Sequence, residues 1–346
     1  MKKWLILLII IFQNVQTVYA VEYTAPEAPA SAEIYMPDET ESFSDGLFYV
    51  LKEALFRFRP DVAEAVTLCL RLIVVMLLIA ILKNFYSSSK AIVNLVSVLC
   101  ISIMLIQSTN SLIQLGIDTV SEISEYGKLL LPVMTATLAA QGGINSSAAL
   151  YTGTAFFSSI LSTLIGRLII PLMYFYMVLC IGYRAVGEDI LKNLRDFLKW
   201  LIVWSIKIVL YIFTGYLTIT GVVSGTTDAA ALKATKLTIS GVVPVVGGII
   251  SDASDTILVS AGIVKNAAGI YGLLAILAIW IGPFLKIGVQ YLLLKAAGGL
   301  CGGIAGDTTS GLIKDFSGIM GILVAMTGTI CLLFLVSIVC YLRGVA

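Results

Sequence analysis

The chain has 346 residues, of which 59% are apolar and only 12% are charged, and its formal net charge is +1. A soluble domain carries roughly 25% charged residues, so this composition excludes an ordinary soluble protein, and the near-neutral charge supplies no basic surface for nucleic acid. The absence of histidine removes the usual general base, the commonest zinc ligand and a Ser-His-Asp triad, and we expect neither a catalytic site nor a cofactor or metal site.

The amino-terminal 60 residues combine a targeting signal with a short segment outside the membrane. Two lysines precede an apolar run that ends in a small-x-small cleavage sequence, so residues 1–20 are predicted to be a signal peptide, with an uncleaved anchor helix as the alternative. Residues 21–42 are rich in proline and glutamate and are expected to form a disordered linker. Apolar residues recur at helical spacing over 43–58, which predicts an amphipathic helix on the outer membrane face, on a partner or on this protein's own bundle.

Apolar runs dominate the remainder, residues 61–346. A membrane-spanning helix needs about 20 such residues, and it must satisfy its backbone hydrogen bonds internally. The eight candidates are 65–82, 91–107, 148–165, 168–183, 201–223, 257–281, 284–294 and 319–342. Two shorter runs, 129–140 and 241–250, each contain one proline and either cross the membrane or re-enter it. The predicted fold class is therefore all-α, a polytopic transmembrane helix bundle.

The prolines of this region suggest an internal duplication. Pro132 and Pro171 are 39 residues apart, Pro244 and Pro283 are also 39 apart, and the two pairs are offset by 112 residues. Repeats with short proline-containing helices in matching positions are common in transport proteins. We predict two tandem units of about 112 residues, with chance agreement as the alternative.

A recurring tripeptide supports the same offset. Lys83-Asn84-Phe85 matches Arg195-Asp196-Phe197 at a distance of 112 residues, and Lys314-Asp315-Phe316 provides a third copy before the last span. The predicted units cover approximately 83–194 and 195–313, with a final span at 317–342.

Basic residues predict which loops face the cytoplasm. The loop at 83–90 and the four basic residues within 184–199 are placed inside by the positive-inside rule. Both loops are inside only if 129–140 crosses the membrane, which gives four crossings in each of two parallel units; a re-entrant run would give three crossings and inverted units. Residues 110–128 then form an outer loop, and 190–199 form an amphipathic helix at the inner interface.

Lys207 is the best candidate for a functional charge inside a span, because ionisable residues at membrane depth commonly mark a pathway or a cavity. It pairs with Asp252, Asp255 or Asp307 in the bundle interior, or else extends its ammonium group to the inner interface beside two tryptophans. The remaining candidates lie at the short proline-containing runs, and the full set is Lys207, Pro132, Pro244, Gly247, Gly248, Asp252 and Asp255.

One stretch has a distinctive sequence, SGVVPVVGGIISDA at residues 240–253, which Asp255 and Gly262 follow. Together with three shorter pieces, it resembles the stage III sporulation protein AE family. The resemblance covers roughly residues 40–346 and is strongest over 125–320. The supporting pieces are Leu131-Pro132, Gln141-Gly142-Gly143 and Lys314-Asp315-Phe316.

The resemblance implies a non-enzymatic, multi-pass component of a channel-like, secretion-like complex in the mother-cell membrane around the forespore. The implied partners are ring-forming and other membrane proteins of that complex, a cytoplasmic ATPase and the lipid bilayer. The family supplies no catalytic or ligand-binding residue to carry over. From the residues alone two further functions stay open, a membrane scaffold and a stand-alone secondary transporter with a site near Pro132–Gly143 and Pro244–Asp255.

Overall fold

Helices and short connections account for the described chain. The computed structural model describes residues 25–37, 42–85, 90–220, 247–302 and 306–343. In these ranges, six helical segments are long and apolar enough to cross a membrane. The predicted all-α, polytopic helix bundle is therefore confirmed, whereas the predicted signal peptide at 1–20 lies outside the described residues.

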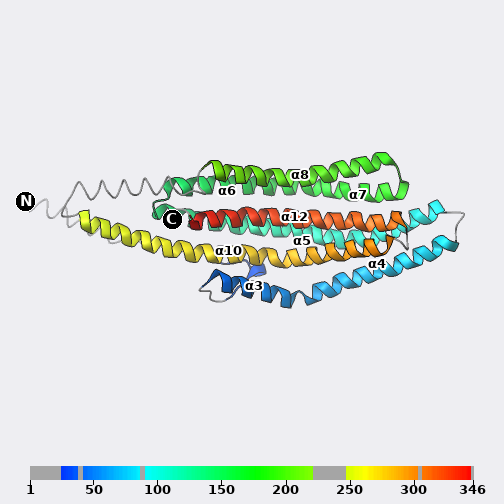
Figure 1. Ribbon diagram of the computed structural model, residues 1–346, viewed down its shortest axis with the longest axis horizontal. Coiled ribbons are helices and arrows are strands. Elements are labelled where there is room, and N and C mark those ends of the chain that lie inside the picture. Colours follow the sequence, from blue (N-terminus) through cyan, green and yellow to red (C-terminus); the bar gives the residue numbers. More distant parts are fainter. Residues whose placement is uncertain (1–24, 38–41, 86–89, 221–246, 303–305, 344–346) are drawn as a thin grey trace, which may run out of the picture.

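The long helices run side by side in an elongated bundle (Figure 1). The π-helical segment η3 joins α6 to α7 without reversing the chain, so 148–165 and 168–183 belong to one crossing and not to the two that were predicted. The bounds are α2 Ala30–Glu33, α3 Phe43–Arg57, α4 Arg59–Phe85, α5 Lys90–Ala140, α6 Ile144–Leu164, η3 Ile165–Ile169, α7 Ile170–Val186, α8 Asp189–Ile219, α10 Gly247–Leu300 and α12 Asp307–Arg343.

Three antiparallel hairpins, α4–α5, α7–α8 and α10–α12, turn at the same end of the bundle (Figure 1). The helix ends near each turn carry basic residues, among them Lys83, Arg184 and Lys314. The positive-inside rule assigns this end to the cytoplasm, and we call it the inner end. The two basic loops at 83–90 and 184–199 thus share one side, as their charge predicted.

Two unusually long helices replace shorter predicted elements. Helix α5 has 51 residues and runs unbroken through 110–128, which was predicted to be an outer loop, and through 129–140. Helix α10 has 54 residues and joins the predicted spans 257–281 and 284–294, with Pro283 inside it. The run 129–140 therefore neither crosses back nor re-enters. The prediction of four crossings is wrong for the first unit, 83–194, whereas residues 221–246 of the second unit lie outside the described residues, and the duplication itself stays a prediction.

Helix α12 packs closely against α5 and fixes how the two lie alongside each other. A Cβ atom on Gly127 would overlap the ring of Phe334, so only glycine lets these helices approach so closely. Further along, the hydroxyls of Thr135 and Tyr341 lie 2.8 Å apart. The outer half of α5 and the outer half of α12 are thus parallel neighbours.

Residues 25–37 are ordered, in contrast to the disordered linker predicted at 21–42; residues 21–24 and 38–41 of that linker lie outside the described residues. Ala32 in α2 is completely buried. The phenol of Tyr126 in α5 donates a hydrogen bond to the carbonyl of Pro26 at 3.3 Å, and the backbone N–H of Ala28 donates to the phenol oxygen of Tyr271 in α10 at 3.3 Å. This segment therefore straps α5 to α10. The linker prediction missed it because small residues and prolines can pack into a groove without forming a long helix.

Helix α3 confirms the amphipathic helix predicted at 43–58. The hydroxyl of Ser42 caps it by accepting a hydrogen bond from the backbone N–H of Asp45. Val50 and Ala54 are buried on the face that packs against α10, whereas Phe48 on the opposite face is exposed. Of the predicted placements, packing on this protein's own bundle is the one observed, and the second face stays uncovered.

Candidate functional site

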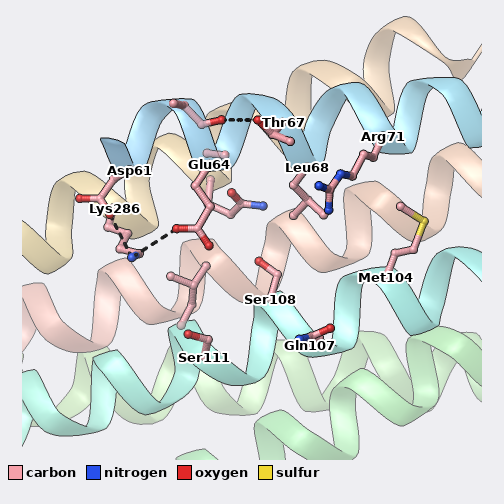
Figure 2. A pocket seen from close by; sticks show the side chains of 14 residues that line it. Asp61, Glu64, Thr67, Leu68, Arg71, Met104, Gln107, Ser108, Ser111 and Lys286 are labelled. Carbon is pink, nitrogen blue, oxygen red and sulfur yellow. Dashed lines mark hydrogen bonds and ion pairs between the residues drawn. The ribbon is translucent and has the colours of Figure 1, made fainter. Parts of the chain in front are cut away.

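A polar cleft lies between α4, α5 and α10 (Figure 2). Its volume is about 630 Å³. Polar and charged side chains supply most of its wall, although the three helices are otherwise strongly apolar. The lining residues with polar side chains are Asp61, Glu64, Thr67 and Arg71 from α4, Gln107, Ser108 and Ser111 from α5, and Lys286 and Gln290 from α10.

Lys286 joins α10 to α4 at one end of this cleft. Its Nζ lies 2.9 Å from Oδ1 of Asp61 and 3.7 Å from Oε2 of Glu64 (Figure 2). Asp61 and Glu64 are three residues apart in the first turns of α4, so they share a face, and the positive end of the helix dipole favours carboxylates there. The ion pair therefore follows from the local sequence of α4 once α10 packs beside it.

Arg71 lies at the other end of the cleft, on the same side of α4 (Figure 2). Across from it, α5 contributes Gln107 and Ser108, and Gln290 of α10 is only 5% exposed. The charged lining groups are two carboxylates and two cations, so the cleft is electrically balanced. Amide, hydroxyl and charged groups at this depth can hold water and polar solutes that the surrounding apolar surface would exclude.

A second charged cluster lies at the inner end, where α7, α8 and α12 meet. Nε of Arg184 lies 2.8 Å from Oδ2 of Asp315, and Nη1 of Arg195 lies 3.1 Å from the same oxygen. Arg195 also pairs with Asp196 at 2.7 Å, and both guanidinium groups lie within 5.0 Å of the ring centre of Tyr183. Two copies of the recurring tripeptide, 195–197 and 314–316, thus bind one another.

This cluster corrects the predicted amphipathic helix at 190–199. Those residues begin α8, and Arg195, which was assigned to the solvated polar face, is buried. Ile190 and Phe197, which were assigned to the buried face, are exposed. The reason is that Asp315 of α12 offers Arg195 a partner inside the bundle, and no local periodicity reveals such a partner.

Lys207 does not enter the bundle interior. It lies on the exposed face of α8, at the end of a shallow groove that also contains Trp200 and Trp204. It forms no ion pair with any residue that the structure describes, so the predicted pairing with Asp307 is wrong. The alternative, an ammonium group beside the tryptophan pair, agrees with this position.

Among the other sequence-predicted candidates, none that the structure describes lines the cleft. Pro132 is exposed within α5, and Pro244 lies outside the described residues. The first turns of α10 hold the remaining four, Gly247, Gly248, Asp252 and Asp255. Their roles stay predictions.

Asp61, Glu64 and Lys286 were not among the candidates that the sequence predicted. A signal for them exists in the chain: two carboxylates three residues apart after Pro60, and a lysine three residues after Pro283. Across the described ranges, no group of three or more histidine, cysteine, aspartate or glutamate residues is arranged to hold a metal ion.

The sequence of this bundle matches that of a known protein family. Residues 39–343 match the family described as Stage III sporulation protein AE. The chain belongs to this family. The match includes the polar cleft, the inner charged cluster and all six long helical segments. The chain is therefore a multi-pass membrane protein of a sporulation family, as its sequence motifs predicted.

One curated relative is Stage III sporulation protein AE of Bacillus subtilis (strain 168), which is 24% identical over 185 residues. The aligned part covers 54% of this chain and 46% of the relative, so less than half of the relative's length is matched. No solved structure matches the chain.

Proposed function

We propose that this protein is the multi-pass membrane core of a channel-like complex that supports forespore development, in the mother-cell membrane surrounding the forespore. The observation that carries the proposal is the family match over the entire bundle, residues 39–343. The polar cleft supports a conducting role, because charged and amide groups inside an apolar bundle usually serve a pathway for water, ions or solutes.

The proposed role is conduction and assembly, not catalysis. The cleft residues are suited to holding water and polar groups by hydrogen bonds. The proposed partners are ring-forming and other membrane proteins of the complex, with a cytoplasmic ATPase at the inner end. The basic turns of the three hairpins give that end a surface for acidic partner residues.

A stand-alone secondary transporter is the weaker alternative. That function was tied to helices broken at Pro132 and Pro244, but α5 continues through Pro132 without a break. The cleft instead lies nearer to the inner end of α5, next to Gln107. A pure scaffold would not need the buried amide of Gln290 or the charges of the cleft.

The experiment is deletion of the gene in the source organism, followed by a late forespore-specific reporter and by the size of engulfed forespores. We expect loss of reporter activity and small forespores with normal vegetative growth. Re-expression of the wild-type gene should restore both. Normal sporulation of the deletion strain, or a defect confined to growth on one nutrient, would refute the proposal and favour the transporter.

A further inference from the structure

The polar cleft between α4, α5 and α10 contains a buried amide without a partner. Gln290 of α10 is only 5% exposed and lines the cleft, and within the described ranges its carboxamide forms no hydrogen bond to another residue. A buried carboxamide that loses its hydrogen bonds to water destabilises the fold unless another group replaces them. The space beside Gln290 is the cleft itself, so this side chain indicates a polar occupant there.

Arg71 of α4 is a second group that lacks a partner. Its side chain lies on the cleft side of α4 (Figure 2), and it forms neither an ion pair nor a hydrogen bond with any residue that the structure describes. Gln107 and Ser108 of α5 lie across the cleft and add amide and hydroxyl donors (Figure 2). An arginine fork with neutral donors around it is an arrangement that binds carboxylate and phosphate groups. This end of the cleft is therefore suited to an oxyanion.

The opposite end of the cleft carries an excess of negative charge. Nζ of Lys286 lies 2.9 Å from Oδ1 of Asp61 but 3.7 Å from Oε2 of Glu64, whose side chain is 77% exposed. Asp61 therefore balances most of the lysine charge, and the Glu64 carboxylate stays open to the cleft. A cationic group fits at this end, because an opposite charge close to the Glu64 carboxylate is attracted to it.

A neutral stretch of α4 separates the two ends. Glu64 and Arg71 are seven residues apart, which is two turns and about 10.5 Å along the helix axis, so they share one face. Between them lie Thr67, whose hydroxyl is already bonded to the carbonyl of Ala63 at 2.7 Å, and the apolar side chain of Leu68. The cleft is thus neutral overall but dipolar along its length.

The exposed surfaces of α4 and α5 show from which side the cleft can be reached. Large apolar side chains are exposed over residues 70–82 of α4 and 92–103 of α5. Further from the inner end, the next exposed positions are Thr67 on α4 and Gln107 on α5, and both line the cleft. The surface that suits lipid therefore ends at the cleft on both of these walls, and the cleft opens toward the outer side.

We propose that the cleft binds a small, water-soluble dipolar solute, which places a carboxylate or phosphate group at Arg71 and a cationic group at Glu64. The carboxamide of Gln290 then gains the hydrogen-bond partner that it lacks. The cleft volume of about 630 Å³ lies in the range of roughly 300–1,000 Å³ that is typical of small-molecule sites. The inference rests on the proposed channel function, and it names the class of solute that the channel handles.

The test is ligand binding to the purified full-length protein in a non-ionic detergent, measured by saturation-transfer difference NMR. The probe is ε-aminocaproate, which carries a carboxylate at one end and an ammonium group at the other. Two analogues remove one charge each: ε-aminocaproamide lacks the carboxylate, and N-acetyl-ε-aminocaproate lacks the cation. We expect saturable binding of the probe and at least about tenfold weaker binding of both analogues. No saturable binding of the probe, or equal binding of ε-aminocaproamide, would overturn the proposal.

Variants of the cleft show whether the probe binds there. We expect Arg71→Gln to weaken binding at least about tenfold and Gln290→Leu to weaken it about threefold or more. Lys295→Gln should bind as wild type does, because Lys295 is exposed on α10 and does not line the cleft. Arg71→Gln should keep the wild-type thermal midpoint, because Arg71 is exposed and has no partner in the described part of the chain. Wild-type affinity in Arg71→Gln would place the probe elsewhere and overturn the site.

A phospholipid head group is the other source of this chemistry, since phosphatidylethanolamine carries a phosphate and an ammonium group. We expect an equimolar amount of this lipid to leave the probe bound. Displacement at that ratio would overturn the soluble solute and assign the cleft to lipid. All arms use the isolated protein, so failure here with a sporulation defect in the deletion strain would refute the cleft site alone. Binding of the probe with normal sporulation of that strain would refute the channel function and leave the site.

Discussion

The side chains of Arg195 and Asp315 tie α8 to α12 at the inner end of the bundle. Nη1 of Arg195 lies 3.1 Å from Oδ2 and 3.3 Å from Oδ1 of Asp315, and Arg184 of α7 shares the same carboxylate. The Asp315 side chain is only 13% exposed. One carboxylate therefore holds three helices together, and the loss of its charge affects two guanidinium groups at once.

Replacement of Asp315 by asparagine should destabilise the bundle strongly. Removing one partner of a buried ion pair leaves uncompensated charge, which costs about 3–5 kcal/mol. The measurement is the thermal midpoint of the purified protein in detergent. Asp196→Asn is the matched control, because Asp196 also binds Arg195 but its side chain is 55% exposed, and its loss should cost at most about 1 kcal/mol. Equal effects of the two variants would contradict this account.

A methyl group at Gly127 should separate α5 from α12. The added Cβ would overlap the ring of Phe334, and overpacking of this kind costs about 1–3 kcal/mol. We expect a lower thermal midpoint for Gly127→Ala and partial recovery in the double variant with Phe334→Leu. Gly215→Ala, where a Cβ meets open space, should leave the midpoint unchanged or raise it slightly, because alanine favours the helix over glycine. Failure of Phe334→Leu to restore any stability would show that the ring is not the obstacle.

The strap at the amino-terminal end should loosen at high pH. Burial raises the pKa of the Tyr35 phenol above its ordinary value near 10, and the negative charge of Asp61 adds to the shift. Because the folded pKa is raised, the stabilisation is complete below pH 10 and is lost as the pH rises through the folded pKa. The thermal midpoint of wild type should therefore fall above about pH 10 more steeply than that of Tyr35→Phe. Identical pH profiles would rule out this role of Tyr35.

The ion pair between Lys286 and Asp61 should matter for sporulation more than for stability. Both side chains are partly exposed, so the pair contributes about 1 kcal/mol or less to folding. Lys286→Glu should leave protein levels unchanged and lower the yield of heat-resistant spores, because the cleft then carries excess negative charge. The double variant Lys286→Glu with Asp61→Lys reverses the pair and should restore the yield.

Lys295→Gln is the control for that experiment, because Lys295 is exposed on α10 and its ammonium group donates a hydrogen bond to the phenol oxygen of Tyr291 at 2.9 Å, with no carboxylate partner among the described residues. A normal spore yield from Lys286→Glu would mean that the charge of the cleft is unimportant. A yield that the charge swap does not restore would mean that the two residues act separately.

The all-α fold class and most membrane-spanning segments could be predicted from the sequence, but the lengths of α5 and α10 could not. Polar residues after Gln107 suggested that the span ended there, since average hydropathy falls. They occupy only one side of the helix, however, and Ile113, Val120 and Ile123 on the other side are buried. A helix with a narrow polar face can continue as long as its apolar side packs against another helix. For α5 that helix is α12, and the sequence of α5 alone does not reveal it.

The positions and partners of the charged residues could not be predicted from the sequence for a similar reason. Lys207 was favoured because it stands alone in an apolar run, yet it lies on the outer surface of α8. Arg195 and Asp315 were recognised only as parts of a recurring tripeptide, and their pairing depends on the way α8 packs beside α12. Patterns within one helix predict its faces, whereas the partner of a buried charge is set by helices more than a hundred residues away.

Helix α5 has a mechanical consequence that follows from its length. Its 51 residues span about 77 Å at 1.5 Å per residue, more than twice the hydrocarbon thickness of roughly 30 Å. A rod of this length acts as a lever: a tilt of about 5° around the contact of Gly127 with Phe334 would displace its far end by several ångströms. A push on the cytoplasmic tip of the α4–α5 hairpin would thereby move groups on the opposite side of the membrane without any change in helical structure.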